Sequence, residues 1–251
     1  MDIGFDYGGS SVFNGRFEEI IIVSQLVMSG KTYDDIRTAV LTDNILGIKT
    51  ASYREKVWNH IMNMWFKYPW WYVRFISSVM ASHLPESDKR LFAYRIFLRR
   101  TGVLREIAIR FLRNKRIVGD TSFTTDELKA FMYRTFSKFR ALSDSMQLKS
   151  ARKALTFFAG VGYVSTGKKR YIYTLDISKK LAVLITYDWY FMEKRKSLEK
   201  SLYVYLLVDT EIQDILSSVV SSPYVDNAFK PTIDKELIVD ALLGEGLMNY
   251  E

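Results

Sequence analysis

The sequence predicts a mainly α-helical fold: a helical bundle at residues 1–85, a basic region with a winged helix-turn-helix and a small β-hairpin at 86–178, and a helical C-terminal extension at 179–251. Two observations support this prediction. Apolar residues recur at three- and four-residue spacing through most of the 251 residues, which is typical of amphipathic helices. Two β-favouring runs, at residues 163–166 and 171–175, are separated by a short glycine-containing loop, which predicts a hairpin.

The N-terminal segment is expected to form four helices. Residues 16–29 are framed by Asn14 as a candidate N-cap and by Gly30. A second helix runs to about residue 41 and opens at Thr32, which forms a possible capping box with the residue three positions later, Asp35. Helices at 52–66 and 70–82 follow, and each ends before a proline, Pro69 and Pro85.

Aromatic residues are concentrated in the third and fourth of these helices. Such side chains could stack on nucleic-acid bases, but aromatic residues in a pair of amphipathic helices more often form a core. We therefore interpret the cluster as core. It contains Trp58, Trp65, Phe66, Tyr68, Trp70, Trp71 and Tyr72.

Basic amphipathic helices are expected next, at residues 87–100 and 103–118. In the second, the apolar stripe contains Leu104, Ile107, Ala108, Phe111 and Leu112, which predicts that Arg105, Arg110, Arg113 and Arg116 lie outside. A turn at residues 120–125 precedes a further helix at 126–142. The outer face of this region is expected to be cationic.

The helix expected at residues 146–160 has Leu148, Ala151, Leu155 and Phe158 on its buried side. Its exposed side is expected to carry Gln147, Lys149, Ser150, Arg152, Lys153 and Thr156. The hairpin that follows has a tip formed by Gly167, Lys168, Lys169 and Arg170. Helices, then a basic helix, then a basic hairpin is the order of a winged helix, in which the second helix of the helix-turn-helix enters the DNA major groove.

The C-terminal extension is expected to contain one or two helices within residues 181–206. Short helices at 211–220 and 235–243 are expected on either side of a loop that contains Pro223 and Pro231.

Positive charge is concentrated in the middle of the chain. Residues 87–170 contain 20 Lys and Arg against 6 Asp and Glu, whereas the whole protein has a net charge of +8. A basic block with acidic flanks favours a polyanionic partner, with Gln147, Ser150 and Arg152 suited to contacting bases. The candidate nucleic-acid-binding residues are Arg99, Arg100, Arg110, Arg113, Lys115, Arg116, Gln147, Lys149, Ser150, Arg152, Lys153, Lys168, Lys169 and Arg170.

The sequence offers little support for catalysis. There is no Cys, and neither His60 nor His83 has a partner at metal-ligand spacing, so we expect no metal and no cofactor. Nucleotide-binding and hydrolase motifs are absent. Asp120, Glu127 and Lys129 imitate the spacing of Mg²⁺-dependent nucleases, but acidic residues at a helix start are more simply explained by the helix dipole. We expect a protein that is not an enzyme.

A cytoplasmic location without membrane insertion is expected. The lack of Cys suits a reducing compartment. Residues 1–11 do not resemble a secretory signal, and the most apolar windows, at 20–28 and 181–192, are too short to cross a bilayer.

Several motifs resemble the BrxA family, a small helical component of BREX phage-resistance systems. They are EEIIIVSQLVMSGKTYDDI at residues 18–36, TDNIL at 42–46, SYR at 52–54, KSARKAL at 149–155 and GYV at 162–164. The resemblance implies a helical fold somewhat like the NusB antitermination factor and binding of double-stranded DNA, and a NusB-like fold keeps RNA open as a ligand. It also implies other BREX proteins as partners, including a DNA methyltransferase, an ATPase and a phosphatase-like protein. The chain departs from the family pattern after Ser178.

Three kinds of function therefore remain. The first is a DNA-binding accessory protein of a bacterial or archaeal BREX system, with low sequence specificity. The second is an adaptor that docks onto another protein through its winged helix, with the basic face meeting an acidic partner. The third is a metal-dependent nuclease.

Overall fold

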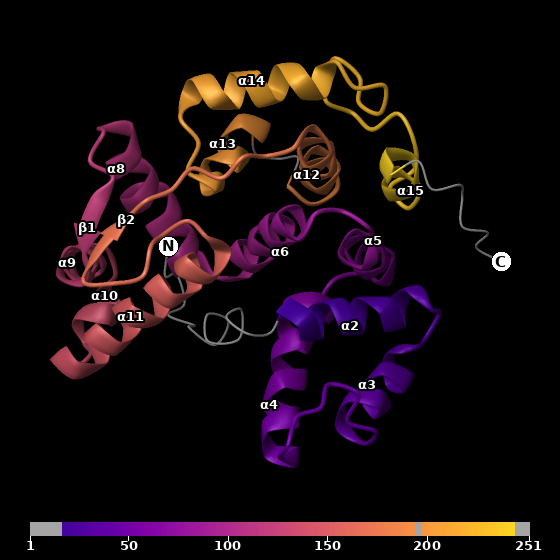
Figure 1. Ribbon diagram of the computed structural model, residues 1–251, viewed down its shortest axis with the longest axis horizontal. Helices are drawn as coiled ribbons and strands as arrows, with labels where there is room; N and C mark the ends of the chain where they lie inside the picture. The colour runs from indigo at the N-terminus through magenta and orange to yellow at the C-terminus, as the bar shows by residue number, and fades with distance from the viewer. Residues whose placement is uncertain (1–16, 194–196, 244–251) are drawn as a thin grey trace.

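The computed structural model describes residues 17–193 and 197–243, and it is mainly helical, as the sequence predicts (Figure 1). Figure 1 shows α6 (Glu86–Arg100) near the centre of the molecule. The N-terminal helices lie on one side of it, the C-terminal helices on another, and the small sheet with its helices at a third. One continuous cluster of buried apolar residues extends from Phe17 to Val239.

The N-terminal part forms the helices expected there. Its elements are α2 (Phe17–Met28), α3 (Tyr33–Leu41), α4 (Ala51–Ile61), the π-helix η1 (Met62–Phe66) and α5 (Trp70–Ala81). The predicted capping box is present, because the Asp35 backbone N–H donates to Thr32 Oγ1 at 3.3 Å and the Thr32 N–H donates to Asp35 Oδ2 at 2.9 Å. Helix α2 packs along α5.

The aromatic cluster is largely core, as expected. Trp58, Trp65 and Tyr72 are buried, and Phe66, Tyr68 and Trp71 pack against the core from its edge. The interpretation is wrong for Trp70, whose relative exposure is 42%. Trp70 is the first residue of α5, directly after Pro69, so its side chain has solvent on the side where the chain enters the helix.

The basic middle begins with α6 and a nearly continuous helical run: α7 (Gly102–Glu106), the π-helix η2 (Ile107–Arg113) and α8 (Asn114–Ile117). The apolar stripe predicted for this run is buried, from Leu104 to Leu112. Next come β1 (Ser122–Thr124), α9 (Thr125–Thr135), α10 (Ser137–Arg140), α11 (Asp144–Val161) and β2 (Lys169–Tyr171).

The sheet differs from the predicted hairpin in one respect. The two predicted arms are bonded as expected, since Ser165 N–H donates to the Tyr171 carbonyl and Tyr173 N–H to the Tyr163 carbonyl, both at 2.9 Å. However, β2 also pairs antiparallel with β1, with Ser122 opposite Tyr171. Residues 122–124 are therefore a strand and not part of a turn, because Phe123 is buried and the register joins them to β2.

The C-terminal extension is helical, as expected. Its elements are α12 (Lys179–Met192), α13 (Leu198–Leu202), the 3-10 helix η3 (Tyr203–Tyr205), α14 (Asp209–Val220) and α15 (Ile238–Leu243). Helix α12 packs against α6 and α14, and every residue from Leu181 to Asp188 is buried. The extension thus shares its core with the basic middle.

Candidate nucleic-acid interface

Helix α11 presents part of the predicted basic face to solvent. Lys149 and Arg152 are exposed, and Lys153 is half-buried. The prediction is wrong for Gln147 and Ser150, which are each only 7% exposed. The 3.6-residue helical period places these two on the same side as the buried Ala151 and Ala154. Gln147 Nε2 donates to the Leu142 carbonyl at 2.9 Å, so its amide fixes the entry to the helix.

The predicted hairpin tip is cationic and exposed. Lys168 and Lys169 are exposed, whereas Arg170 is half-buried and donates from Nη1 to the Ser165 carbonyl at 2.9 Å. Gly167 has φ +122°, a conformation that side-chain-bearing residues rarely adopt, and this permits the reversal of the chain. Lys169 Nζ lies 5.8 Å from the centre of the Tyr171 ring.

We call five of these cations, on α11 and the hairpin, the open basic set. None of them forms an ion pair with a residue that the structure describes. Their positive charge is consequently available to a polyanion. The set consists of Lys149, Arg152, Lys153, Lys168 and Lys169.

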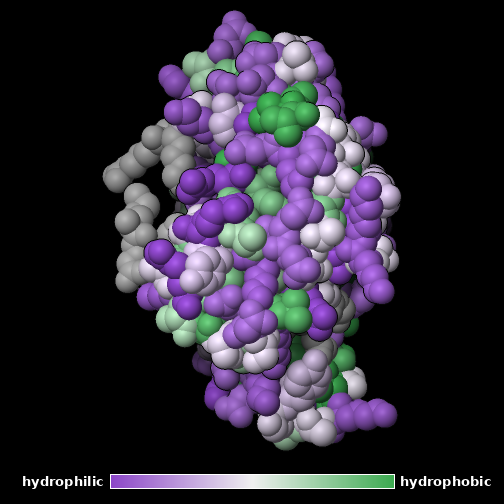
Figure 2. Space-filling view, turned by 90° about the vertical axis from the view of Figure 1, so that its left-hand side faces the viewer, coloured by the Kyte–Doolittle hydropathy of each residue, from purple (hydrophilic) through white to green (hydrophobic). Residues whose placement is uncertain are grey.

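Figure 2 views the molecule from the side that carries α8 to α11 and the two strands, and this face is largely hydrophilic with scattered apolar patches. The apolar side chains exposed on these elements or directly after them include Ile117, Val118, Tyr171 and Tyr173. Tyr171 and Tyr173 are two residues apart along an extended chain, so they share one side of the sheet.

Two arginines predicted to lie outside are turned inward. Arg113 is 7% exposed; its Nε donates to the Leu207 carbonyl at 2.7 Å and its Nη2 to Asp209 at 2.6 Å. Arg116 binds the Glu211 carboxylate with both terminal nitrogens and also donates to the Leu206 carbonyl at 2.6 Å. The prediction of outward Arg113 and Arg116 is therefore wrong, since their partners lie far away in the sequence.

These contacts join the basic middle to the extension. We call Arg113, Arg116, Asp209 and Glu211 the C-terminal clamp. The guanidinium of Arg113 also lies 3.8 Å from the centre of the Tyr203 ring. A hydrogen bond from Arg116 lowers the pKa of Glu211 below its usual value, so both partners are charged at neutral pH.

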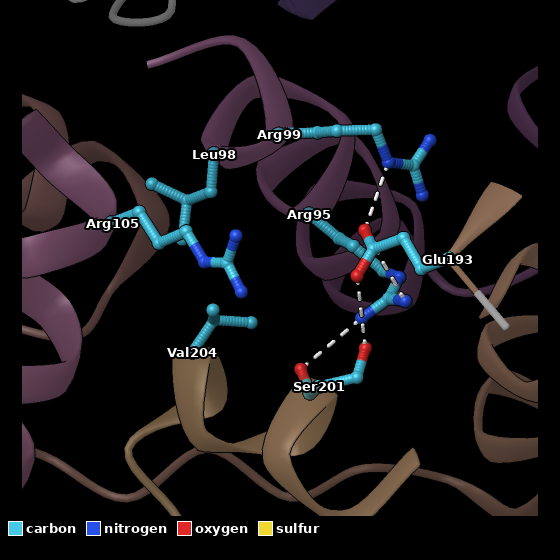
Figure 3. Close-up of a pocket in the computed structure, with 7 residues that line it drawn as sticks. All are labelled: Arg95, Leu98, Arg99, Arg105, Glu193, Ser201 and Val204. Atoms are coloured by element: carbon cyan, nitrogen blue, oxygen red, sulfur yellow. Dashed lines mark hydrogen bonds and ion pairs between the residues drawn. The ribbon is translucent and has the colours of Figure 1, made fainter. Parts of the chain in front are cut away.

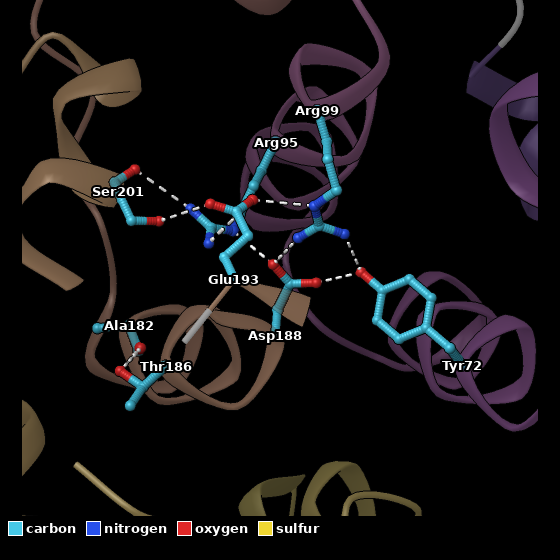
Figure 4. A network of polar contacts seen from close by, with 8 residues as sticks. All are labelled: Tyr72, Arg95, Arg99, Ala182, Thr186, Asp188, Glu193 and Ser201. Atoms are coloured by element: carbon cyan, nitrogen blue, oxygen red, sulfur yellow. Dashed lines mark hydrogen bonds and ion pairs between the residues drawn. The ribbon is translucent and has the colours of Figure 1, made fainter. Parts of the chain in front are cut away.

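Arg99 belongs to a buried polar network at the centre of the molecule (Figure 4). Arg99 donates to Tyr72 Oη at 2.5 Å and to Glu193 from Nε at 2.9 Å, and it also bonds Asp188. Arg95, one helical turn earlier on α6, donates from Nε to Asp188 at 2.5 Å. The side chain of Asp188 is completely buried, so the two arginines compensate its charge.

Opposite charges inside this network stabilise one another. Burial alone lowers the pKa of Arg99, but the charges of Asp188, Tyr72 and Glu193 outweigh it and raise the pKa above its ordinary value. Burial and the nearby charge of Asp188 raise the pKa of Tyr72. Arg99 therefore stays charged within the core and takes a structural position, apart from the open basic set.

The remaining candidates are spread along the helices. Arg100 is exposed, with Nη2 donating to the Lys67 carbonyl at 3.1 Å and its guanidinium 4.6 Å from the centre of the Tyr68 ring. Arg110 is 60% exposed and lies 3.5 Å from Glu106. These two cations are accessible but stand on other elements than the open basic set.

The nuclease-like carboxylates converge on a lysine. Lys115 bonds Asp120 and lies 3.1 Å from Glu127. The hydrogen bond from Lys115 lowers the pKa of Asp120. Burial alone would raise the pKa of Glu127, but hydrogen bonds from the Thr124 backbone N–H and from Lys115 outweigh burial and lower it. Glu127 also accepts from the Thr124 N–H at 2.7 Å in a capping box. Lys129 pairs instead with Asp144 on α11. Among the described residues no group of His, Cys, Asp or Glu could hold a metal ion.

Sequence reasoning missed two exposed cations next to α11. Arg134 lies on α9 and Arg140 on α10, both exposed and without an ion pair to a described residue. The signal was present in the sequence, because α9 precedes the basic helix and carries its apolar residues at Leu128 and Met132, which turns Arg134 outward. The first helix of a helix-turn-helix commonly crosses the DNA backbone.

The sequence matches one known protein family. A family model described as BrxA matches residues 12–187, which is more than half of the 251 residues. The chain belongs to the BrxA family. Membership supports a role in BREX-associated defence and an association with the BREX system. The BrxA match covers α2 to α11, the sheet and most of α12, and it ends before the Asp209 and Glu211 half of the clamp.

No curated protein matches the chain at a significant level. In the parts of this BrxA family member that the structure describes, no helix has the length and apolar character needed to span a membrane.

Proposed function

We propose that this protein binds duplex DNA through the open basic set as an accessory protein of BREX defence. We also propose that it acts in the cytoplasm, because a chain without Cys suits a reducing compartment. In this proposal the elements from η2 to β2 are a winged helix-turn-helix. Helix α11 is the recognition helix and the loop at Lys168 is the wing. The order of a helix, β1, two packed helices and then two paired strands supports it.

The observation that carries the proposal is the combination of accessibility and lack of ion pairs. Four of the five cations of the open basic set are exposed and one is half-buried. Cations that neutralise phosphates supply affinity without reading sequence. Of the three side chains suited to contacting bases, only Arg152 is exposed, because Gln147 and Ser150 are buried. We therefore propose low sequence specificity, with no catalytic step and no cofactor.

The proposed interface differs from the sequence-based one. Four of the cations predicted from the sequence form ion pairs with carboxylates of the protein, and we leave them out of the interface. They are Arg99, Arg113, Lys115 and Arg116. Arg134 and Arg140 take their place as candidates for backbone contacts beside α11.

The test is fluorescence-anisotropy titration of a labelled DNA duplex, and of the matched RNA duplex, across a salt series. Replacing Lys149, Arg152 and Lys153 with Ala should reduce the slope of log affinity against log salt by about two to three units, at roughly 0.9 per phosphate contact. A matched control replaces Arg37, Lys49 and Lys56 with Ala. These three cations are exposed and lie in α3, in the loop before α4 and in α4.

Equal losses in the two triple variants would contradict the proposal, because any cation would then serve. Preferential binding of the RNA duplex would favour the NusB-like alternative. The adaptor alternative is favoured by the exposed pair Tyr171 and Tyr173. An adaptor should lose a BREX partner in a pull-down when both tyrosines are changed to Ser, while its DNA affinity stays the same.

A further inference from the structure

Two tyrosines lie on the outer face of the small sheet, on the side of the molecule viewed in Figure 2. Tyr171 is 47% and Tyr173 49% exposed, whereas Ile172 between them is buried. Side chains alternate between the two faces of an extended strand, so both rings point away from the core. Aromatic rings exposed in this way are available to a ligand.

Small neighbours leave the ring of Tyr171 open. Ser122 lies opposite it on β1. On the other arm of the hairpin, the Ser165 N–H donates to the Tyr171 carbonyl at 2.9 Å, and the Tyr171 N–H donates to Ser165 Oγ at 2.8 Å. The backbone of Tyr171 is thus held from both sides before a ligand binds, which reduces the conformational entropy that binding costs.

Two cations of the open basic set lie beside these rings. Lys169 is two residues before Tyr171, on the same side of the strand, with its Nζ 5.8 Å from the centre of the ring. Lys168 precedes it, and both are exposed. Asp120, whose charge interacts with that of Lys169, is bonded by Lys115. Aromatic rings next to positive charge are the combination that binds single-stranded nucleic acid.

The spacing of the rings suits a strand whose bases are unstacked. Residues two apart along a β-strand are separated by about 6.6–6.8 Å, whereas bases follow one another at about 3.4 Å along each strand of duplex DNA. Bases in a duplex are also covered by their neighbours in the stack, so a tyrosine ring cannot lie flat on them. An unpaired strand can place one base on each ring.

Two pockets within the described residues are too small to compete for a base. One lies between α6, α7 and α13, where Figure 3 shows Arg105 and Glu193 among its lining residues. The other is lined by Met28 and Phe75, among others, and each has a volume of about 10 Å³. That is room for one water-sized species. The exposed rings of the sheet are thus a better place for a base than either pocket.

We propose that the outer face of the sheet binds unpaired nucleotides of DNA, with bases stacked on Tyr171 and Tyr173 and Lys169 contacting a phosphate. The preferred ligand is then a duplex that continues into a single strand. This inference rests on the function proposed above, because the open basic set holds the duplex part. Helix α11 ends at Val161 and the first arm of the hairpin follows directly, so the two surfaces are adjacent in the chain.

The test is an anisotropy titration with three labelled ligands of one duplex sequence. The first is blunt, the second carries about six unpaired thymidines, and the third carries the same number of abasic nucleotides. The thymidine extension should tighten binding about tenfold or more relative to the blunt duplex, since stacking adds to the affinity for each base. The abasic extension carries the same phosphates and should tighten binding far less.

Variants of the rings separate stacking from other contacts. Changing both Tyr171 and Tyr173 to Leu should abolish the gain from the thymidine extension and leave the affinity for the blunt duplex unchanged. Changing both to Phe should retain the gain, because the rings remain. Tyr133→Leu is the matched control, since Tyr133 is 48% exposed but lies on α9, and it should also retain the gain.

Failure of this inference differs from failure of the proposed function. The inference is overturned if the thymidine extension gives no gain, or if the leucine variant keeps it, while the blunt duplex still binds through α11. The rings would then be left to the protein-docking alternative. An unaltered protein that does not bind the blunt duplex would overturn the proposed function and this inference together.

A last measurement uses the unaltered chain, so it does not depend on the folding of a variant. The thymines of the extension are replaced with 5-iodouracil, and the complex is irradiated and mapped by mass spectrometry. We expect cross-links at Tyr171 or Tyr173. Cross-links confined to residues outside the sheet would overturn the inference.

Discussion

Arg116 and Glu211 are 95 residues apart in the sequence and form a bidentate ion pair between α8 and α14. Their neighbours Arg113 and Asp209 form a second pair at 2.6 Å. Part of the positive surplus of the basic middle is thus neutralised within the protein. A cation held by such an internal partner has less positive charge to offer a nucleic-acid phosphate.

Arg116→Met should lower the free energy of unfolding by about 1.5–3 kcal/mol, since it removes charge-assisted hydrogen bonds and leaves Glu211 without its partner. The loss is measured by urea denaturation. In a double-mutant cycle, Glu211→Gln should cost less in the Arg116→Met background than in the unaltered protein. DNA affinity should stay within about twofold once the protein is folded, and a drop as large as that of the α11 variants would be evidence against the clamp.

Asp188→Asn should cost about 3–5 kcal/mol of stability, because it leaves Arg95 and Arg99 facing each other in the core with only Glu193 to balance them. Chemical denaturation measures this cost. Asp176→Asn is the matched control, since Asp176 is exposed and lies just before α12. Similar stabilities of the two variants would show that the network is not required.

Alkaline pH should destabilise the fold through four buried tyrosines, Tyr72, Tyr94, Tyr163 and Tyr205. Burial raises the pKa of each above the ordinary value of 10. The contribution of these tyrosines to the free energy of unfolding is therefore fully present below pH 10. It is lost as the pH rises above 10 towards the raised pKa values of the folded state.

Spectrophotometric titration checks this expectation. The four buried hydroxyls should ionise only together with the loss of the helical circular-dichroism signal. Complete tyrosine ionisation while the helical signal is intact would disprove the expectation.

Arg134→Ala and Arg140→Ala should each weaken DNA binding and reduce its salt slope by about one unit, with little change in stability, because both side chains are exposed and free of ion pairs with described residues. Arg113→Ala is the contrasting variant, because its main effect should be a lower free energy of unfolding and not weaker DNA binding. Unchanged salt slopes in both variants would place the DNA away from α9 and α10.

Much of the local structure could be predicted from the sequence. The Thr32 capping box, the buried stripe of η2 and the two arms of the hairpin all follow from short-range patterns. The strand at Ser122–Thr124 could not be found in this way, because three residues are too few to show an alternating pattern of apolar and polar side chains. Its pairing partner, β2, is also distant in the sequence. It is the register, a property of the folded chain, that makes them a strand.

The candidate site was predicted less completely than the fold. Lys149 and Arg152 face solvent as the helical period indicates. Arg99, Arg113 and Arg116 do not, because an arginine at the edge of an apolar stripe can turn inward when a carboxylate is available there. Their partners are on α12 and α14. One clue was visible: Asp188 interrupts an otherwise apolar run, and a charge in that position requires an opposite charge nearby.

The clamp also affects how shortened versions of this protein would behave. A fragment that ends near residue 187, where the family match ends, would lose Asp209 and Glu211 and also Asp188 and Glu193. Four guanidinium groups, of Arg95, Arg99, Arg113 and Arg116, would then have no carboxylate partner. Such a fragment would attract DNA, heparin or any other polyanion more strongly than the intact chain does. Its affinity would be a product of the truncation, so only a chain that keeps the C-terminal extension reports the charge that the folded molecule presents to its ligand.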